Sequence, residues 1–162
     1  MSFYYKASKR LGFNIGKGIS QDCLFHAIYF LDFETGSLLV SNRFSDNLSY
    51  LRDDLICSFL KGINMFINEL NEGAHEELQE INFKDTRILF ERENRLLVIG
   101  VSGKKDLQME REILREILED FYLRFKKHIN TFDGSIAPVI TAYKKRLESM
   151  NLDSILKYKT RT

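Results

Sequence analysis

The chain has 162 residues, 44% of them hydrophobic, which is enough to bury the core of one folded domain. Its 24 basic residues are balanced by 23 acidic ones, and this net charge of +1 gives no overall reason to bind nucleic acid. The two cysteines fit neither a disulfide framework nor a metal knuckle, so reduced thiols and a cytoplasmic location are expected. With no apolar run of about 18 residues, we expect no transmembrane segment and no signal peptide.

The first 21 residues differ from the rest, because they are basic and contain no acid. One interpretation is an arm that touches an anionic surface or packs on the domain, and the other is a partly ordered leader. The run Gly12–Gly18 is not a phosphate loop, because the spacing is one residue short and no Ser or Thr follows Lys17. The basic residues are Lys6, Lys9, Arg10 and Lys17.

The stretch Cys23–Leu31 is the most apolar of the chain and carries no formally charged residue apart from its histidine. Its large apolar residues fall on both faces of a two-residue period, which predicts a central strand covered on both sides. We expect Leu24, Ile28 and Phe30 on one face and Phe25, Tyr29 and Leu31 on the other.

Four further strands are predicted. The segment Asp32–Gly36 is typical of a tight hairpin with Gly36 at positive φ, and Leu38–Phe44 follows it as an antiparallel strand. Leu78–Arg92 contains two strands joined by a turn. Leu96–Val101 is again apolar on both faces, so we expect it beside the first strand in the middle of the sheet.

A helix is predicted from Asp53 to about Leu70. At 100° per residue its apolar residues occupy one arc of roughly 140°, the width expected of a helix that lies on a sheet. These residues are Leu55, Ile56, Phe59, Leu60, Ile63, Phe66, Ile67 and Leu70. The opposite face is the candidate partner-binding surface, and it carries Lys61, Asn64, Met65 and Asn68.

Two more helices are predicted, at 108–130 and 135–150. The apolar arc of the first is about 180° wide, so part of it cannot reach the sheet. Residues expected on the sheet are Ile113, Leu114, Ile117 and Phe121, and those expected under the last helix are Leu118, Tyr122 and Ile129. The covering stripe of the last helix consists of Ile136, Val139, Ile140, Tyr143, Leu147 and Met150.

Catalytic chemistry is not indicated. His26 lies in the central strand, where a hydrogen-bonded core histidine is expected. Cys57 has no base that the sequence places beside it, as a nucleophile would need. Asp32 and Glu34 could chelate a cation, although a hairpin turn explains both. We therefore predict no catalytic residue, no cofactor, no metal site and no enzymatic activity.

Several apolar and turn motifs resemble those of the longin domain. The longin domain belongs to the wider profilin-like group, which also includes the roadblock proteins. The resemblance covers residues 23–150, and within this range the chain is similar to archaeal longin-domain proteins. The resemblance implies an α/β sandwich of the α+β class, in which a five-stranded antiparallel sheet has helices on both faces. The expected order of elements along the chain is strand-strand-helix-strand-strand-strand-helix-helix. The domain would span 22–150, between a basic extension at 1–21 and a tail at 151–162. The motifs are Ala27–Asp32, Glu34–Gly36, Leu39–Val40, Arg43–Phe44, Phe59–Leu60 and Arg87–Glu91.

The resemblance implies a non-enzymatic protein-interaction module, an adaptor or platform for small GTPases or vesicle-traffic complexes. Its partner would be a small GTPase or another longin or roadblock subunit, with a homodimer and peripheral membrane contact left open. The alternative is a small-ligand sensor of the profilin-like or PAS-like kind, which would need a cavity between sheet and helix.

Overall fold

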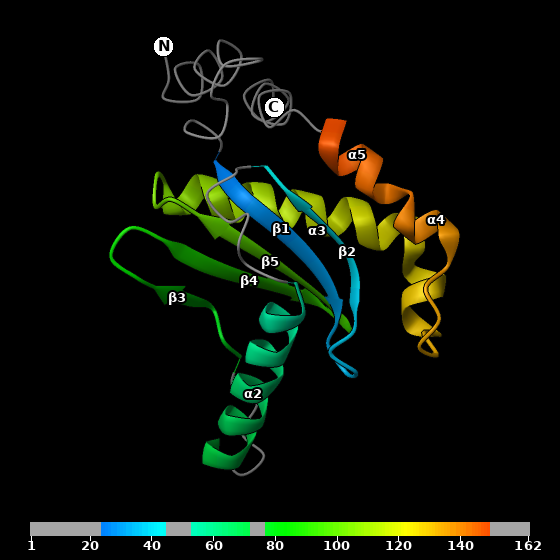
Figure 1. Cartoon of the computed structure of the whole chain (residues 1–162), viewed down its shortest axis with the longest axis horizontal. Helices are drawn as coiled ribbons and strands as arrows, with labels where there is room; N and C mark the ends of the chain where they lie inside the picture. The colour runs from blue at the N-terminus through cyan, green and yellow to red at the C-terminus, as the bar shows by residue number, and fades with distance from the viewer. Residues whose placement is uncertain (1–23, 45–52, 72–76, 150–162) are drawn as a thin grey trace.

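A computed structural model describes residues 24–44, 53–71 and 77–149 (Figure 1). The predicted basic extension at 1–21 and the tail at 151–162 lie outside the described residues. The elements in chain order are β1 (Phe25–Asp32), β2 (Leu38–Arg43), α2 (Asp53–Asn71), β3 (Glu80–Asn82), β4 (Arg87–Glu93), β5 (Leu96–Ser102), α3 (Leu107–Asn130), α4 (Pro138–Thr141) and α5 (Tyr143–Ser149).

The strands form one antiparallel sheet in the order β2-β1-β5-β4-β3. The predicted five-stranded antiparallel sheet with helices, of the α+β class, is therefore confirmed. The two most apolar strands, β1 and β5, are neighbours, and neither lies at an edge. Phe30 of β1 faces Val98 of β5 on one side and Val40 of β2 on the other. Alternate side chains of these strands enter two separate apolar clusters, which is why the strands are apolar throughout.

A bulge at the start of β1 changes which face one residue occupies. The pairing of β1 with β5 shifts register between Phe25 and Ala27. An extra residue in one strand interrupts the alternation of side chains. Phe25 therefore joins the apolar cluster of Ile28 and Phe30, and its predicted place on the opposite face with Tyr29 is wrong. The sequence gives no signal for this bulge.

Gly100 of β5 makes room for the displaced Phe25 ring. A Cβ placed on Gly100 would lie 2.6 Å from Phe25 Cε1 and 3.0 Å from Leu114 Cδ1. Real Cβ atoms essentially never approach a neighbour as closely as 2.6 Å, so a side chain here would displace the ring. A glycine at this point of a buried strand permits the close approach.

The larger apolar cluster lies between the sheet and the layer of α3, α4 and α5. Its centre is aromatic: the rings of Phe30 and Phe121 stack at 4.2 Å between centroids, and Tyr143 packs edge-on against both. The residues predicted to face the sheet from α3 are all buried, namely Ile113, Leu114, Ile117 and Phe121. Leu118 and Ile129 are buried in the same cluster as Ile140, Tyr143 and Leu147 of the last two helices, as predicted.

The segment predicted as one helix at 135–150 forms two short helices instead. Ala137 is extended, with φ −63° and ψ 140°, and the helix begins at Pro138. Proline disfavours helical geometry in the residue before it but is well placed in a first turn. Between α4 and α5 the Lys145 N–H donates to the Ala142 carbonyl, a tighter turn than the α-helix makes. Ile136 and Val139 are exposed, not part of the covering stripe, and Met150 lies outside the described residues.

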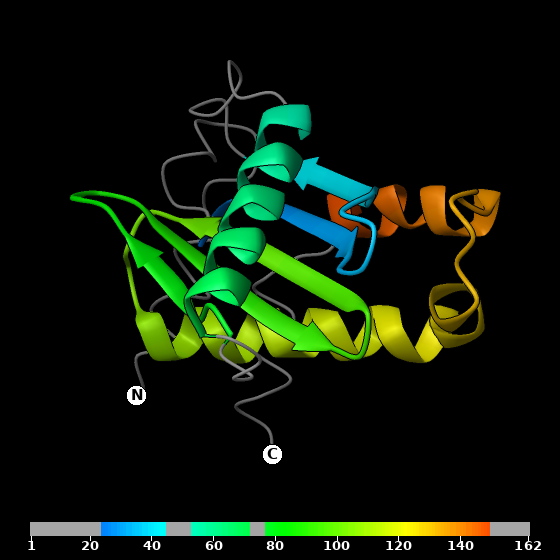
Figure 2. The same ribbon diagram turned by 90° about the horizontal axis from the view of Figure 1, so that it is seen from below.

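A second apolar cluster contains two buried residues of α2, Ile56 and Leu60, together with strand residues such as Tyr29 and Leu31. The rest of the predicted sheet-facing arc of α2 does not all pack there: Leu55, Phe59 and Phe66 are exposed. Leu55 and Phe59 lie in the first two turns, directly before the buried Ile56 and Leu60, so the sheet covers a narrower arc of α2 than the wheel indicates. Figures 1 and 2 show that α2 crosses the strands obliquely and that its later turns, which carry Phe66, extend past the sheet.

This difference changes an expected stability effect. Full burial would make Phe59→Ala cost about 3–5 kcal/mol, but Phe59 is 45% exposed. We expect Phe59→Ala to cost about 1 kcal/mol, whereas Leu60→Ala, one position on and buried, should cost roughly 2–3 kcal/mol. Denaturant unfolding of the two variants tests this directly. A loss at Phe59 equal to or above that at Leu60 would mean that α2 is rotated from the position described.

Candidate functional site

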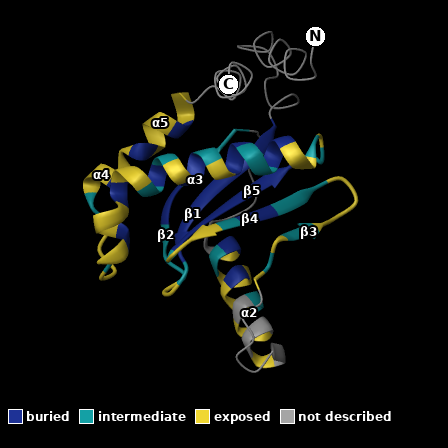
Figure 3. Cartoon of the chain, turned by 180° about the vertical axis from the view of Figure 1, so that it is seen from behind, coloured by how far each residue is buried: buried dark blue, intermediate teal, exposed yellow. Residues whose placement is uncertain are grey.

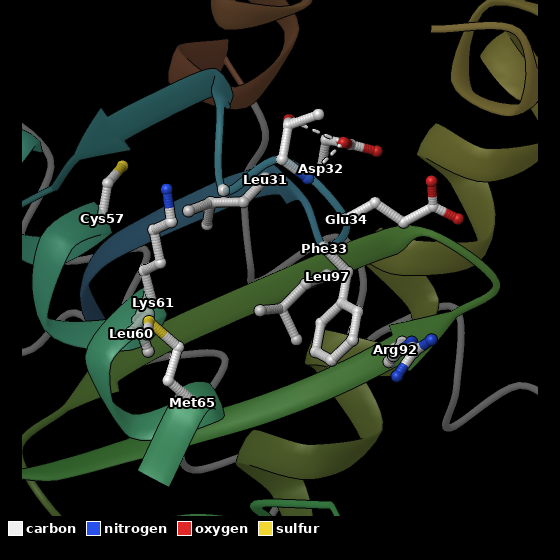
Figure 4. A pocket seen from close by; sticks show the side chains of 12 residues that line it. Leu31, Asp32, Phe33, Glu34, Cys57, Leu60, Lys61, Met65, Arg92 and Leu97 are labelled. Carbon is white, nitrogen blue, oxygen red and sulfur yellow. Dashed lines mark hydrogen bonds between the residues drawn. The ribbon is translucent and has the colours of Figure 1, made fainter. Parts of the chain in front are cut away.

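A groove of about 370 Å³ lies between α2 and the turn that joins β1 to β2 (Figure 4). Residues from four elements and the turn meet there, although they are spread over more than 60 positions of the chain. Its lining consists of Leu31, Asp32, Phe33, Glu34, Thr35, Gly36, Cys57, Leu60, Lys61, Met65, Arg92 and Leu97.

The floor of the groove is apolar. Leu31 and Leu97 project from adjacent strands, because they are paired across β1 and β5 and share a face of the sheet. Leu60 reaches them from the buried side of α2. Phe33 lies beside Leu97 at the open end of the floor, and Met65, 62% exposed, forms part of the rim (Figure 4). An apolar side chain of a bound molecule would be desolvated against this floor.

The charged residues that line the groove are two bases, Lys61 and Arg92, and two acids, Asp32 and Glu34. The Arg92 guanidinium lies over the Phe33 ring at 3.6 Å from its centroid, and it forms an ion pair of 3.1 Å with Glu77. Lys61 is exposed and has no ion pair among the described residues. Its stem lies against the turn, since a Cβ on Gly36 would be 3.8 Å from Lys61 Cδ. The groove therefore combines an apolar floor with a rim of both charges, on which Lys61 is the base without an ion pair among the described residues.

The carboxylate of Asp32 is buried at the end of the groove and fully engaged. Arg95 donates to both of its oxygens, at 2.8 and 3.0 Å, and Thr35 donates through its backbone N–H and its hydroxyl, at 2.9 and 2.7 Å. Burial raises the pKa of Asp32, but the hydrogen bonds from Arg95 and Thr35 outweigh it and hold the pKa below its ordinary value. Asp32 therefore fastens the β1–β2 turn to the β4–β5 turn.

A cation site at Asp32 and Glu34, weighed from the sequence, has no support in this geometry. Glu34 is 63% exposed in its side chain and lies 3.5 Å from Arg95. Among the described residues, no group of three or more His, Cys, Asp or Glu could hold a metal ion. The expected hairpin accounts for both acids, and Gly36 has the expected positive φ of 76°.

A second buried carboxylate, Glu110 at the start of α3, also has hydrogen-bond donors at both of its oxygens. It accepts hydrogen bonds from Arg87 at 3.0 Å and from the Ser102 hydroxyl at 2.5 Å. Its other oxygen accepts the backbone N–H groups of Lys105 and Asp106, at 3.0 and 2.8 Å. These bonds satisfy N–H groups before the helix, a capping role that the sequence did not suggest. Glu110 is a structural group and does not form part of a site.

Two of the four predicted partner-binding residues, Lys61 and Met65, line the groove. The side chains of Asn64 and Asn68 lie outside the described residues. The sequence analysis did not single out Phe33, Arg92 and Leu97 as site residues, because only the pairing of β1, β5 and β4 brings them to α2.

The surface of α2 carries exposed large apolar side chains along much of its length. Among the side chains that the structure describes, nine large apolar ones are exposed, and four of these lie on α2. Single exposed apolar residues are normal, but several on one helix mark an interaction surface. We call Leu55, Phe59, Met65 and Phe66 the α2 apolar surface; Met65 joins it to the groove.

His26 is not the hydrogen-bonded core residue that was expected. It is half-buried beside the β1 bulge, and its buried Nδ1 has no hydrogen-bond partner among the described residues. Burial lowers the pKa of His26, and the positive charge of Lys105 lowers it further. The folded chain therefore favours the neutral imidazole.

This pKa predicts a loss of stability in mild acid. As the pH falls below about 6.5, the unfolded chain takes up a proton at His26 that the folded chain does not, so the free energy of unfolding decreases. The decrease continues until the pH reaches the lower folded pKa. We expect His26→Leu to flatten this part of the pH profile in denaturant unfolding. Equal profiles for His26→Leu and the wild type would contradict the assignment.

Comparison with known proteins gives no family name. No family model matches the chain, and neither does any curated protein. The site must therefore be interpreted from its own geometry. In the described ranges, no helix has both the length and the apolar character needed to cross a membrane.

Proposed function

We propose that this chain is a non-enzymatic protein-interaction module that binds its partner through α2. The observation that carries the proposal is the juxtaposition of the groove with the α2 apolar surface. Exposed apolar area next to a concave site is typical of surfaces that become buried in a complex. The large aromatic and Met residues on α2 are the types enriched in such interfaces.

The longin-like assignment is the second part of the proposal. Under it, α2 covers one face of the sheet and α3 to α5 the other, in an α/β sandwich of longin-like element order. The resemblance then implies an adaptor or platform, and the partner is a small GTPase or another longin or roadblock subunit, working in the cytoplasm. The support is the shared motif residues of β1, β2 and α2 together with the exposed surface of α2.

The charges of the groove describe the segment that it would accept. Lys61 and Arg92 flank an apolar floor, and the nearby Asp32 is neutralised by Arg95. A partner segment with one apolar anchor beside an acidic residue complements this arrangement. The acid would meet Lys61, the cation of the rim that is without an ion pair among the described residues.

One observation favours the alternative, a small-ligand sensor. A volume of about 370 Å³ is within the range of small-ligand sites. The sensor hypothesis needs an enclosed cavity between sheet and helix, and on the side of α3 to α5 the rings of Phe30, Phe121 and Tyr143 are in direct contact. On the side of α2, the groove is bordered by the exposed Lys61, Met65 and Arg92, so we place the interaction module first.

The test measures which proteins from cells that express the chain are retained by the immobilised wild type and by two matched double variants. Lys61→Glu with Met65→Glu changes the groove, and Phe83→Glu with Lys84→Glu replaces one apolar and one basic residue in the same way at the β3–β4 turn. All four side chains are exposed, so both variants should melt within about 2 °C of the wild type. We expect the wild type and the turn variant to retain the same protein, and the groove variant to lose it.

Mass spectrometry of the retained protein then separates the proposals. A small GTPase or another sheet-domain subunit supports the adaptor function. Equal retention by both variants would remove the groove as the docking site. A small molecule that copurifies with the wild type and is lost from the groove variant, with no retained protein, would favour the sensor.

A further inference from the structure

Positive charge is concentrated at one end of the described structure. Residues 120–149 contain six Lys or Arg and three Asp or Glu, whereas the whole chain is nearly neutral. The preceding part of α3, 107–119, contains four Glu and two Arg and is therefore net acidic. The charge of the helical layer thus changes sign along α3 toward α4 and α5.

Four lysines of this end carry most of the unpaired charge. Arg124 and Arg146 both pair with Asp120, at 3.1 and 3.0 Å. Lys126, Lys127, Lys144 and Lys145 are exposed and form no ion pair among the described residues. We call these four side chains the lysine platform.

The platform is held rigid by the contacts beneath it. The Tyr143 hydroxyl donates to Asp120 at 2.6 Å, and the Tyr143 ring packs against Phe121 and Phe125 at 4.9 and 5.7 Å. Lys144 and Lys145 directly follow this anchored tyrosine, and Lys126 and Lys127 directly follow Phe125. Phe125 is non-helical, with φ −125° and ψ 16°, so Lys126 and Lys127 follow a kink in α3 that packs against Tyr143. The four lysines therefore flank two residues that are in contact with each other.

Exposed aliphatic side chains accompany the lysines. Leu123 is 73% exposed on α3, and Ile136 and Val139 are exposed in and before α4. Figure 3 shows exposed positions in the C-terminal part of α3 and along α4 and α5. Exposed apolar and cationic groups on the outer surface of neighbouring helices are the combination found in proteins that bind the membrane interface.

We infer that this outer surface of α3 to α5 binds an anionic phospholipid bilayer. The lysines would lie at the headgroups, and Leu123 would reach toward the acyl boundary. The aliphatic character favours a bilayer over single-stranded nucleic acid, because single strands are bound by aromatic side chains on which bases stack. On this surface the exposed large apolar residues that the structure describes, Leu123, Ile136 and Val139, are all aliphatic. Since the platform and the α2 groove use different elements, a membrane and a protein could be bound together.

The strength of such binding follows from the lysines. Each basic residue near an anionic surface increases partitioning about fivefold, so four lysines support reversible, salt-sensitive binding. Reversing two of them should reduce partitioning about 25-fold or more. Raising the salt from about 0.1 M to about 0.5 M should have a similar effect, because the screening length shortens.

The test is cosedimentation of the full chain with phosphatidylcholine vesicles that contain about 30% phosphatidylserine, and with pure phosphatidylcholine vesicles. The platform variant is Lys126→Glu with Lys127→Glu. The matched control is Lys84→Glu with Lys105→Glu, which changes net charge equally at exposed positions near the β3–β4 turn and the start of α3. Leu123→Ser removes the apolar contact alone. Thermal unfolding of each variant shows whether it is folded.

We expect binding to the anionic vesicles only, loss of binding in the platform variant, retention in the control, and a weakened complex for Leu123→Ser. Equal loss in both charge variants would mean a net-charge effect and would overturn the proposal. Unchanged binding by the folded platform variant would do the same, since another part of the chain would then hold the lipid. Charge-dependent binding to a single-stranded oligonucleotide with none to vesicles would assign the platform to nucleic acid.

Discussion

Phe121→Ala should be the most damaging single truncation in the core, at about 3–5 kcal/mol of unfolding free energy. Phe121 is fully buried at the centre of the larger cluster, where it stacks on Phe30 at 4.2 Å and meets Phe125 at 4.9 Å and Tyr143 at 4.9 Å. Removing the ring would leave a cavity that joins the sheet to α3 and α5. Because the three partner rings come from different elements, the cavity cannot close by the movement of one helix.

Leu123→Ala on the same helix is the control for this prediction. Leu123 is exposed to solvent, so its truncation should cost roughly 0.5 kcal/mol or less. Chemical denaturation of the two variants gives both values. Comparable losses at the two positions would place α3 in a different rotation about its axis and would remove the aromatic cluster as the centre of the fold.

Asp32→Ala should cost roughly 3 kcal/mol, near the lower end for breaking a buried ion pair. The carboxylate is 1% exposed and holds both the Arg95 guanidinium and the β1–β2 turn. Without it, Arg95 would remain largely buried in its side chain, which is 19% exposed, and would lose its bidentate partner. Glu34→Ala, at an exposed acid 3.5 Å from the same arginine, should cost no more than about 0.5 kcal/mol.

The pH dependence of this pair has a defined sign. The pKa of Asp32 is below its ordinary value in the folded chain, so its contribution is fully present above about pH 4. The contribution is lost as the pH falls through the folded pKa, while Arg95 stays protonated. Asp32→Asn should therefore lower stability at neutral pH and show a smaller further loss in acid. A wild-type and a variant curve that remain parallel down to about pH 2 would show that Asp32 is not paired in solution.

Much of the sheet could be predicted because the sequence patterns that indicate strands and tight turns involve residues close together in the chain. Apolar residues on both faces identified β1 and β5 as inner strands, and the Asp32–Gly36 turn set the hairpin. The wide apolar arc of α3 required a second cover, and α4 and α5 supply it. The bulge beside His26 could not be foreseen, because a one-residue shift in pairing depends on the partner strand.

The site was only partly predictable. Lys61 and Met65 were found because an amphipathic helix shows its polar side in the sequence. The exposure of Phe59 and Phe66 was missed, because apolar residues on a predicted helix are assumed to be covered. The Asp32–Arg95 pair joins residues 63 positions apart, and the contact of Arg92 with Phe33 also depends on how the strands pair. Such contacts follow from topology and carry no motif.

The proposed function depends on the groove side of α2 being the surface that a protein partner covers. The most direct measurement places a photoreactive phenylalanine analogue at position 65 and, in a second protein, at position 123, which is also exposed. After irradiation in cells that express the chain, the account predicts one defined protein crosslink from position 65 that position 123 does not give. No protein product from position 65, or the same product from both positions, would contradict it.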